Sequence, residues 1–110
     1  TSPNGAIYAL WDDLDPSQGG QVRYAQIDAS QFVVEWRDVP TKSNGQLSSF
    51  QIVLWPSGQV RITYMAVGDP IGSTVGLESW DASIGLPVAC NGTGRTPQAG
   101  QTRFYNTALP

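Results

Sequence analysis

Three carboxylates follow an apolar stretch near the start of the chain, in the segment IYALWDDLDP at residues 7–16. Asp12, Asp13 and Asp15 offer oxygen ligands at short spacing, which Ca²⁺ prefers, but the run lacks the glycine and the distal glutamate of an EF-hand loop. The structural alternative is that Asp13 and Asp15 cap a turn through side-chain hydrogen bonds, with Pro16 fixing the backbone. We expect the capping role and no cofactor, and keep calcium at these three residues as the alternative.

The same carboxylates could serve as the acid and base of a glycosidase. Asp12 and Asp13 would point to opposite faces if the preceding strand continued, so they suit a single scissile bond poorly. The chain contains no histidine, which removes the usual general base near neutral pH and the commonest metal ligand. Hydroxyl groups and the thiol of Cys90 would have no histidine to activate them as nucleophiles. We predict no catalytic residue and no enzymatic activity.

Four tryptophans suggest a second chemistry, because aromatic side chains supply flat apolar faces on which sugar rings can stack. Trp36 lies on the inward side of a strand with alternating polarity, so we expect it in the core. Trp55 and Trp80 lie at the ends of strands, and Trp55 has the parity opposite to the apolar residues before it. We keep Trp55 and Trp80 as candidate residues for binding a polysaccharide, with packing as the commoner role of such side chains.

Two residues at the start of the Gly-rich segment at residues 90–100 could be modified. Asn91 begins the tripeptide Asn-Gly-Thr, which is the acceptor pattern for N-glycosylation, in an expected surface loop. Cys90 is the only cysteine, so the chain can form no internal disulfide and no thiolate zinc site. We expect Cys90 to be buried as a small apolar residue, with an intermolecular disulfide as the alternative.

The charge and composition of the chain exclude several classes of partner. The net charge is −3, and the six basic residues are dispersed, whereas nucleic-acid binding requires a clustered positive surface. No apolar run approaches the ~20 residues of a membrane span. We therefore expect no nucleic-acid partner and no membrane insertion. A chain of 110 residues, 40% of them hydrophobic, can bury a core as one domain without disulfides.

Hydrophobic residues alternate with a period of two through most of the chain, which predicts β-strands. The clearest unit is a hairpin in which residues 47–55 and 59–67 flank a turn at Pro56-Ser57-Gly58. Its inward-facing residues pair across the two strands, Phe50, Ile52 and Leu54 with Val60, Ile62 and Tyr64. Further strands are expected at residues 6–11, 21–28, 31–39, 73–80 and 101–106.

Six to eight short strands separated by turn residues predict an all-β fold, an antiparallel β-sandwich, with jelly-roll and Ig-like topologies both open. A short helical turn at residues 81–86 is an open alternative, and residues 90–100 are expected to form a loop. We expect residues 1–110 to form a single β-sandwich domain, or the C-terminal portion of a larger module.

The order of four segments resembles a nidogen-like extracellular β-sandwich module of secreted bacterial proteins. The segments are IYALWDDLDPSQGGQVRY, QFVVEWRDVP, SSFQIVLWPSGQVRITY and TVGLESWDASIG, and TRFYNTALP resembles the closing strand. The resemblance implies an extracellular or cell-surface location and a structural or adhesive role. One departure is that the family usually carries further strands before the Trp-Asp-Asp segment.

These observations predict a non-catalytic module that acts through its surfaces, in adhesion or filament assembly. A sheet that lacks a strand exposes unpaired backbone groups. Another protein chain, or another copy of this one, could then supply the strand by β-augmentation. The alternative function is a carbohydrate- or calcium-binding accessory domain of a secreted hydrolase or protease.

Overall fold

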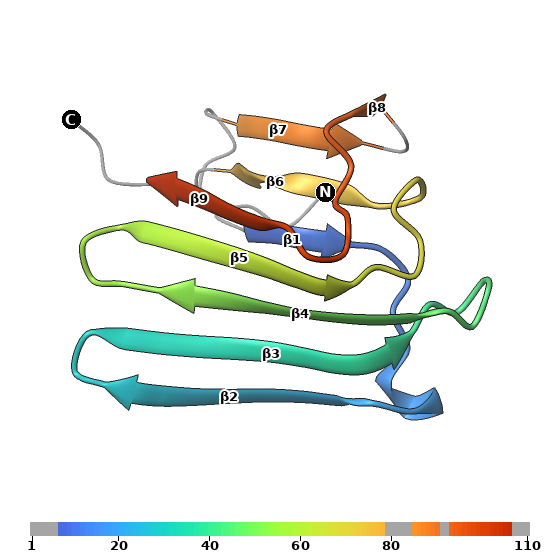
Figure 1. Cartoon of the computed structure of the whole chain (residues 1–110), viewed down its shortest axis with the longest axis horizontal. Helices are drawn as coiled ribbons and strands as arrows, with labels where there is room; N and C mark the ends of the chain where they lie inside the picture. The colour runs from blue at the N-terminus through green and yellow to red at the C-terminus, as the bar shows by residue number, and fades with distance from the viewer. Residues whose placement is uncertain (1–6, 79–84, 91–92, 107–110) are drawn as a thin grey trace. The chain divides into compact units, whose positions relative to one another are not determined.

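The computed structural model describes residues 7–78, 85–90 and 93–106, which form two antiparallel sheets (Figure 1). One sheet has the strand order β1-β6-β7-β8 and the other the order β2-β3-β4-β5-β9. The predicted all-β, antiparallel class is confirmed, and two sheets are what a β-sandwich requires. The strands are β1 (Ile7–Trp11), β2 (Gln21–Asp28), β3 (Gln31–Pro40), β4 (Leu47–Leu54), β5 (Gln59–Ala66), β6 (Thr74–Glu78), β7 (Gly85–Cys90), β8 (Thr93–Gly94) and β9 (Thr102–Asn106).

The chain divides into two compact units, each built around one of the sheets. The first unit consists of residues 1–12 and 69–97 and contains the four-stranded sheet. The second consists of residues 13–68 and 98–110 and contains the five-stranded sheet together with a short 3-10 helix, η1 (Pro16–Gln18). The expectation of a single domain over the whole chain stays a prediction.

The centre of the five-stranded sheet is the predicted hairpin of β4 and β5. Its cross-strand pairs are Phe50 with Tyr64, Ile52 with Ile62 and Leu54 with Val60. All six residues are buried except the half-buried Leu54. Strand β3 adds Trp36 to the same face, with its ring stacked 4.6 Å from that of Phe50. The expected inward-facing set is therefore confirmed by both register and burial.

We call this side of the five-stranded sheet the apolar face, and it becomes exposed toward β2. Trp36 and Val34 of β3 are half-buried, and all eight residues of β2 are exposed. Val22 pairs with Trp36, and Tyr24 pairs with Val34, so both β2 residues lie on the apolar face. The alternating pattern of the sequence thus continues onto a strand that is not buried.

A close backbone approach marks the point where β2 begins. Gly20 has a φ of +76°, and a Cβ atom there would overlap the carbonyl oxygen of Asp38 and lie 2.6 Å from that of Arg37. Asp38 itself has a positive φ of 52°, at a shift in the β3–β4 register. The Ser49 hydroxyl accepts a hydrogen bond of 2.8 Å from the Asp38 backbone N–H. Glycine at position 20 is therefore required by both conformation and space.

The four-stranded sheet contains two strands that the sequence did not predict. Gly85 and Leu86 begin β7, where a helical turn was the open alternative, and β8 lies in the expected loop at residues 90–100. Pro87 weakens the strand signal of β7, because proline cannot donate a ladder hydrogen bond. The structure places Pro87 opposite Gly76, next to an irregularity in the register, which is where strands tolerate proline.

Candidate functional site

The acidic segment forms a capped turn at Asp15. This residue is the N-cap of η1, and its carboxylate accepts hydrogen bonds from the backbone N–H of Ser17, at 3.0 Å, and from the Ser17 hydroxyl. Pro16 occupies the first helical position, where its missing N–H costs nothing. The predicted capping role is confirmed for Asp15. The exposed Asp13 contributes its backbone carbonyl, which accepts a hydrogen bond of 2.8 Å from the N–H of Lys42.

The strand before this segment ends at Trp11, so Asp12 and Asp13 do not continue it. The expectation that they point to opposite faces assumed that the strand continued through both residues, and it does not. In the part of the chain that the structure describes, no three acidic, histidine or cysteine side chains lie together as a metal site would require. Calcium binding by Asp12, Asp13 and Asp15 stays a prediction. The hydrogen bonds of the Asp15 carboxylate are explained by its capping role without a metal ion.

Strand β2 is an edge strand of the five-stranded sheet, and it carries large apolar side chains that are exposed. The exposed fractions are 44% for Val22, 77% for Tyr24 and 61% for Ile27. Phe32 of β3 is 36% exposed, and its ring stacks 5.9 Å from that of Tyr24. Among the described residues, no strand pairs with the outer side of β2. This edge therefore presents both free backbone groups and apolar side chains.

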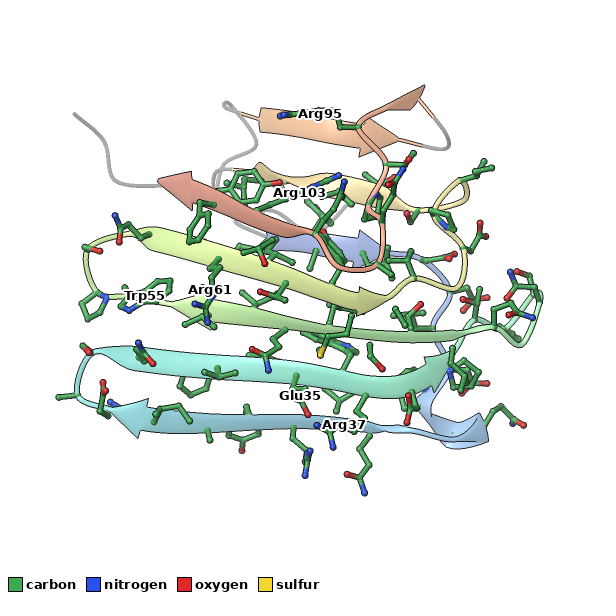
Figure 2. All side chains as sticks on the ribbon, in the orientation of Figure 1. Glu35, Arg37, Trp55, Arg61, Arg95 and Arg103 are labelled. Atoms are coloured by element: carbon green, nitrogen blue, oxygen red, sulfur yellow. The ribbon has the colours of Figure 1, made fainter. Side chains whose placement is uncertain are left out.

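The opposite face of β2 and β3 carries an ion-pair cluster around Glu35 (Figure 2). The Glu35 carboxylate lies 3.0 Å from a guanidinium nitrogen of Arg23 and 3.3 Å from one of Arg37, and it accepts a hydrogen bond of 3.1 Å from Gln51. The hydrogen bond from Arg23 is the main reason that the pKa of Glu35 lies below its ordinary value of 4.5. Burial acts in the opposite sense and is outweighed. Glu35 is therefore a structural anion, because a general acid at neutral pH needs a raised pKa and the pKa of Glu35 is lowered.

A groove of about 430 Å³ lies where the β4–β5 hairpin turns, beside β9. In Figure 2 Trp55 and Arg61 lie side by side, and the Arg61 Cζ atom is 5.6 Å from the centre of the Trp55 ring. Phe104 of β9 is paired in register with Arg61 and is 73% exposed. Gln59 and Tyr105 complete the lining. We call this feature the Trp55 groove.

Of the two predicted sugar-binding residues, the structure describes one. Trp55 is half-buried and lines the groove, whereas Trp80 lies outside the described residues, as do Asn91 and the side chain of Cys90. Sequence reasoning missed Arg61 and Phe104 as neighbours of Trp55. The parity of residues 53–61 places Trp55 and Arg61 on one face, but the pairing of β9 with β5 has no local signal.

These features define a class of protein: an all-β module whose described surface offers an exposed strand edge and an aromatic groove. A family model described as NIDO related matches residues 1–109. The chain therefore belongs to the nidogen-related family, as its resemblance to a nidogen-like module predicted. No curated protein and no solved structure gives a significant match. None of the described helices is long and apolar enough to cross a membrane.

Proposed function

We propose that this protein is a non-catalytic extracellular module that associates with copies of itself by pairing β2 of one copy with β2 of another. Membership of the nidogen-related family supports an extracellular module. The single observation that carries the association is the exposed edge of β2, with eight exposed residues in a row. An exposed edge that is long and apolar is a ready template for another strand.

The composition of β2 leaves this edge largely unprotected. Natural sheets protect their edges with proline, lysine, bulges or short strands. Strand β2 has eight residues and contains neither proline nor lysine, and its only register irregularity lies between Gln26 and Asp28. The centre of the strand, from Val22 to Gln26, is regular and open to pairing.

A second copy suits this edge because antiparallel pairing about a two-fold axis joins each face of the strand to the same face of its copy. The apolar face, with Val22 and Tyr24, then continues from one copy into the other. Antiparallel pairing also brings the beginning of one strand to the end of the other. In a register centred near Ala25, Arg23 of one copy, which also pairs with Glu35, lies near Asp28 of the other, and their charges are complementary. Side-chain and backbone hydrogen bonds from Ser30 hold the pKa of Asp28 below its ordinary value, so this carboxylate is charged at neutral pH.

Sedimentation velocity over a range of protein concentrations tests this proposal. We expect a reversible dimer whose dissociation constant rises at least about tenfold in Tyr24→Lys, because a lysine on an edge strand opposes pairing and the substitution counts twice in a symmetric dimer. Ile71→Lys is the matched control, since Ile71 is 68% exposed and lies outside β2. This control should dimerise like the wild type.

A synthetic peptide with the sequence of β2, QVRYAQID, gives a second arm. It should compete for the edge and shift the dimer toward monomer, whereas a scrambled peptide should not. A chain that remains monomeric at millimolar concentration would disprove self-association. A dimer that Tyr24→Lys leaves intact would place the interface elsewhere and disprove the role of β2.

A further inference from the structure

The Trp55 groove lies away from the β2 edge, across the five-stranded sheet, and self-association through β2 makes no use of it. Its walls combine aromatic surface with one cation and one amide. Trp55 is half-buried, whereas Phe104 exposes 73% of its surface and Gln59 is also exposed. An aromatic ring so exposed loses favourable packing in water unless something covers it.

Arg61 is the polar centre of the groove. Within the described residues its guanidinium has no carboxylate partner, in contrast to Arg23 and Arg37, which share Glu35. Its Nε atom is buried and makes no hydrogen bond there. A buried N–H without a partner costs about 1–3 kcal/mol. A ligand oxygen in the groove can accept hydrogen bonds from the terminal N–H groups of this guanidinium, whereas the buried Nε is not open to it.

The stack on Trp55 holds this guanidinium in place. The distance of 5.6 Å from Cζ to the ring centre is within the range of a cation–π contact. A guanidinium is planar, and its terminal N–H groups form a fork that matches the two oxygens of a carboxylate; the stack on the indole fixes the orientation of that fork. Because the protein has a net charge of −3, general electrostatic attraction does not favour anions. Any preference for an anion must therefore come from a local group such as Arg61.

We propose that the Trp55 groove binds a sugar that carries a carboxylate, such as a uronic acid unit of an acidic polysaccharide. Arg61 pairs with the carboxylate. Phe104 covers the apolar C–H face of the sugar ring, Trp55 holds the guanidinium beside it, and the Gln59 amide hydrogen-bonds to hydroxyl groups. A groove that is open to solvent on one side suits a flat and polar ring, because the ligand's remaining hydroxyls stay in water.

Isothermal titration with short oligogalacturonates and with their methyl esters tests this proposal. The two probes share the same sugar ring and differ only at the carboxyl group, which is an anion in the acid and is neutral and carries a methyl group in the ester. The acid should bind at least about tenfold more tightly than the ester, because a charged hydrogen-bond acceptor is worth more than a neutral one.

Three substitutions separate the contributions. Arg61→Gln should abolish the preference for the acid over the ester, and Phe104→Ala, at an exposed position, should weaken both probes by severalfold. Arg37→Gln is the matched control, since it removes one positive charge from the same sheet outside the groove. This variant should bind both probes like the wild type. Arg61→Lys keeps the charge but loses the planar fork, so it should bind the acid less tightly than wild type does.

Equal affinity for the acid and the ester, a preference that survives in Arg61→Gln, or no binding by either probe at millimolar concentration would overturn the proposal. Poly-glutamate is a further probe, and binding as tight as that of oligogalacturonate would indicate a site for acidic peptides instead. The titrations are repeated in Tyr24→Lys, so that failure of sugar binding and failure of self-association are observed independently.

Discussion

Strands β2 and β5 belong to the same sheet, have eight residues each and begin alike, with Gln-Val-Arg followed by a large apolar residue, yet their environments differ completely. In β5 the alternate residues Val60, Ile62 and Tyr64 are buried, with exposed fractions of 3%, 1% and 0%. Every residue of β2 is exposed. Strand β5 lies between β4 and β9, whereas β2 ends the sheet. Alternation therefore shows which side chains share a face, and it does not show whether that face is covered.

The comparison also shows two ways of stabilising a strand. Burial of aromatic and aliphatic side chains dominates at β5. Strand β2 is attached instead by its backbone ladder to β3, by the close approach at Gly20 and by the ion pair between Arg23 and Glu35. A strand attached in this way keeps its outer edge and its apolar side chains available to a partner.

The largest expected difference in stability between the two strands is between substitutions of two tyrosines on the apolar face. Tyr64→Ala should lower the free energy of unfolding by about 4 kcal/mol, since it removes a fully buried aromatic side chain from the core. At protein concentrations where the chain is monomeric, Tyr24→Ala should change it by less than about 0.5 kcal/mol, because the side chain is 77% exposed. Urea denaturation of both variants measures the difference. Similar losses in the two variants would show that β2 is buried in solution.

The second test concerns the backbone approach where β2 begins. Gly20→Ala should cost about 3 kcal/mol, which combines an unfavourable positive φ with overlap on the carbonyl oxygens of β3. Gly45→Ala is the matched control, with a φ of +71° but open space around the new methyl group. It should cost about 1 kcal/mol, from conformation alone. Equal costs by thermal unfolding would mean that β3 shifts freely to accommodate the methyl group.

The smallest effect is expected for the ion-pair cluster between β2 and β3. Glu35→Gln should cost at most about 1 kcal/mol at pH 7, because both arginines are more than half exposed. Since the folded pKa of Glu35 is lowered, its contribution is present above the ordinary value of 4.5 and is lost as the pH falls through the folded pKa. The difference in melting temperature between wild type and variant should therefore shrink between pH 7 and pH 3. A constant difference would exclude the ionised carboxylate as its origin.

Most strands could be predicted because their signals are local. The expected strand at residues 21–28 matches the observed bounds, and the hairpin register follows from its turn and its alternating residues. Strands β7 and β8 were missed, because Pro87 and the glycines of the following segment lack that pattern. Strand β7 is placed by its pairing with β6, and β8 by its pairing with β7, and neither pairing leaves a pattern in the sequence of the strand itself.

The candidate sites divide in the same way. The capping role of Asp15 could be predicted from the sequence, because the Asp15 carboxylate, Pro16 and the donor N–H of Ser17 lie within three residues. Trp55 could be assigned to one face by parity. Its neighbour Phe104 could not be identified, because 49 positions separate the two residues and only the pairing of β5 with β9 brings them together.

The amino-acid sequence by itself determined the all-β class, the central hairpin, the capped acidic turn and the family, because each depends on the types and order of residues close together in the chain. Only the tertiary structure decided which strand ends the five-stranded sheet, which apolar residues stay exposed and which side chains line the Trp55 groove. The reason is that these properties depend on strand order. Strand order is set by pairing between distant segments, which hydrophobic alternation leaves undetermined.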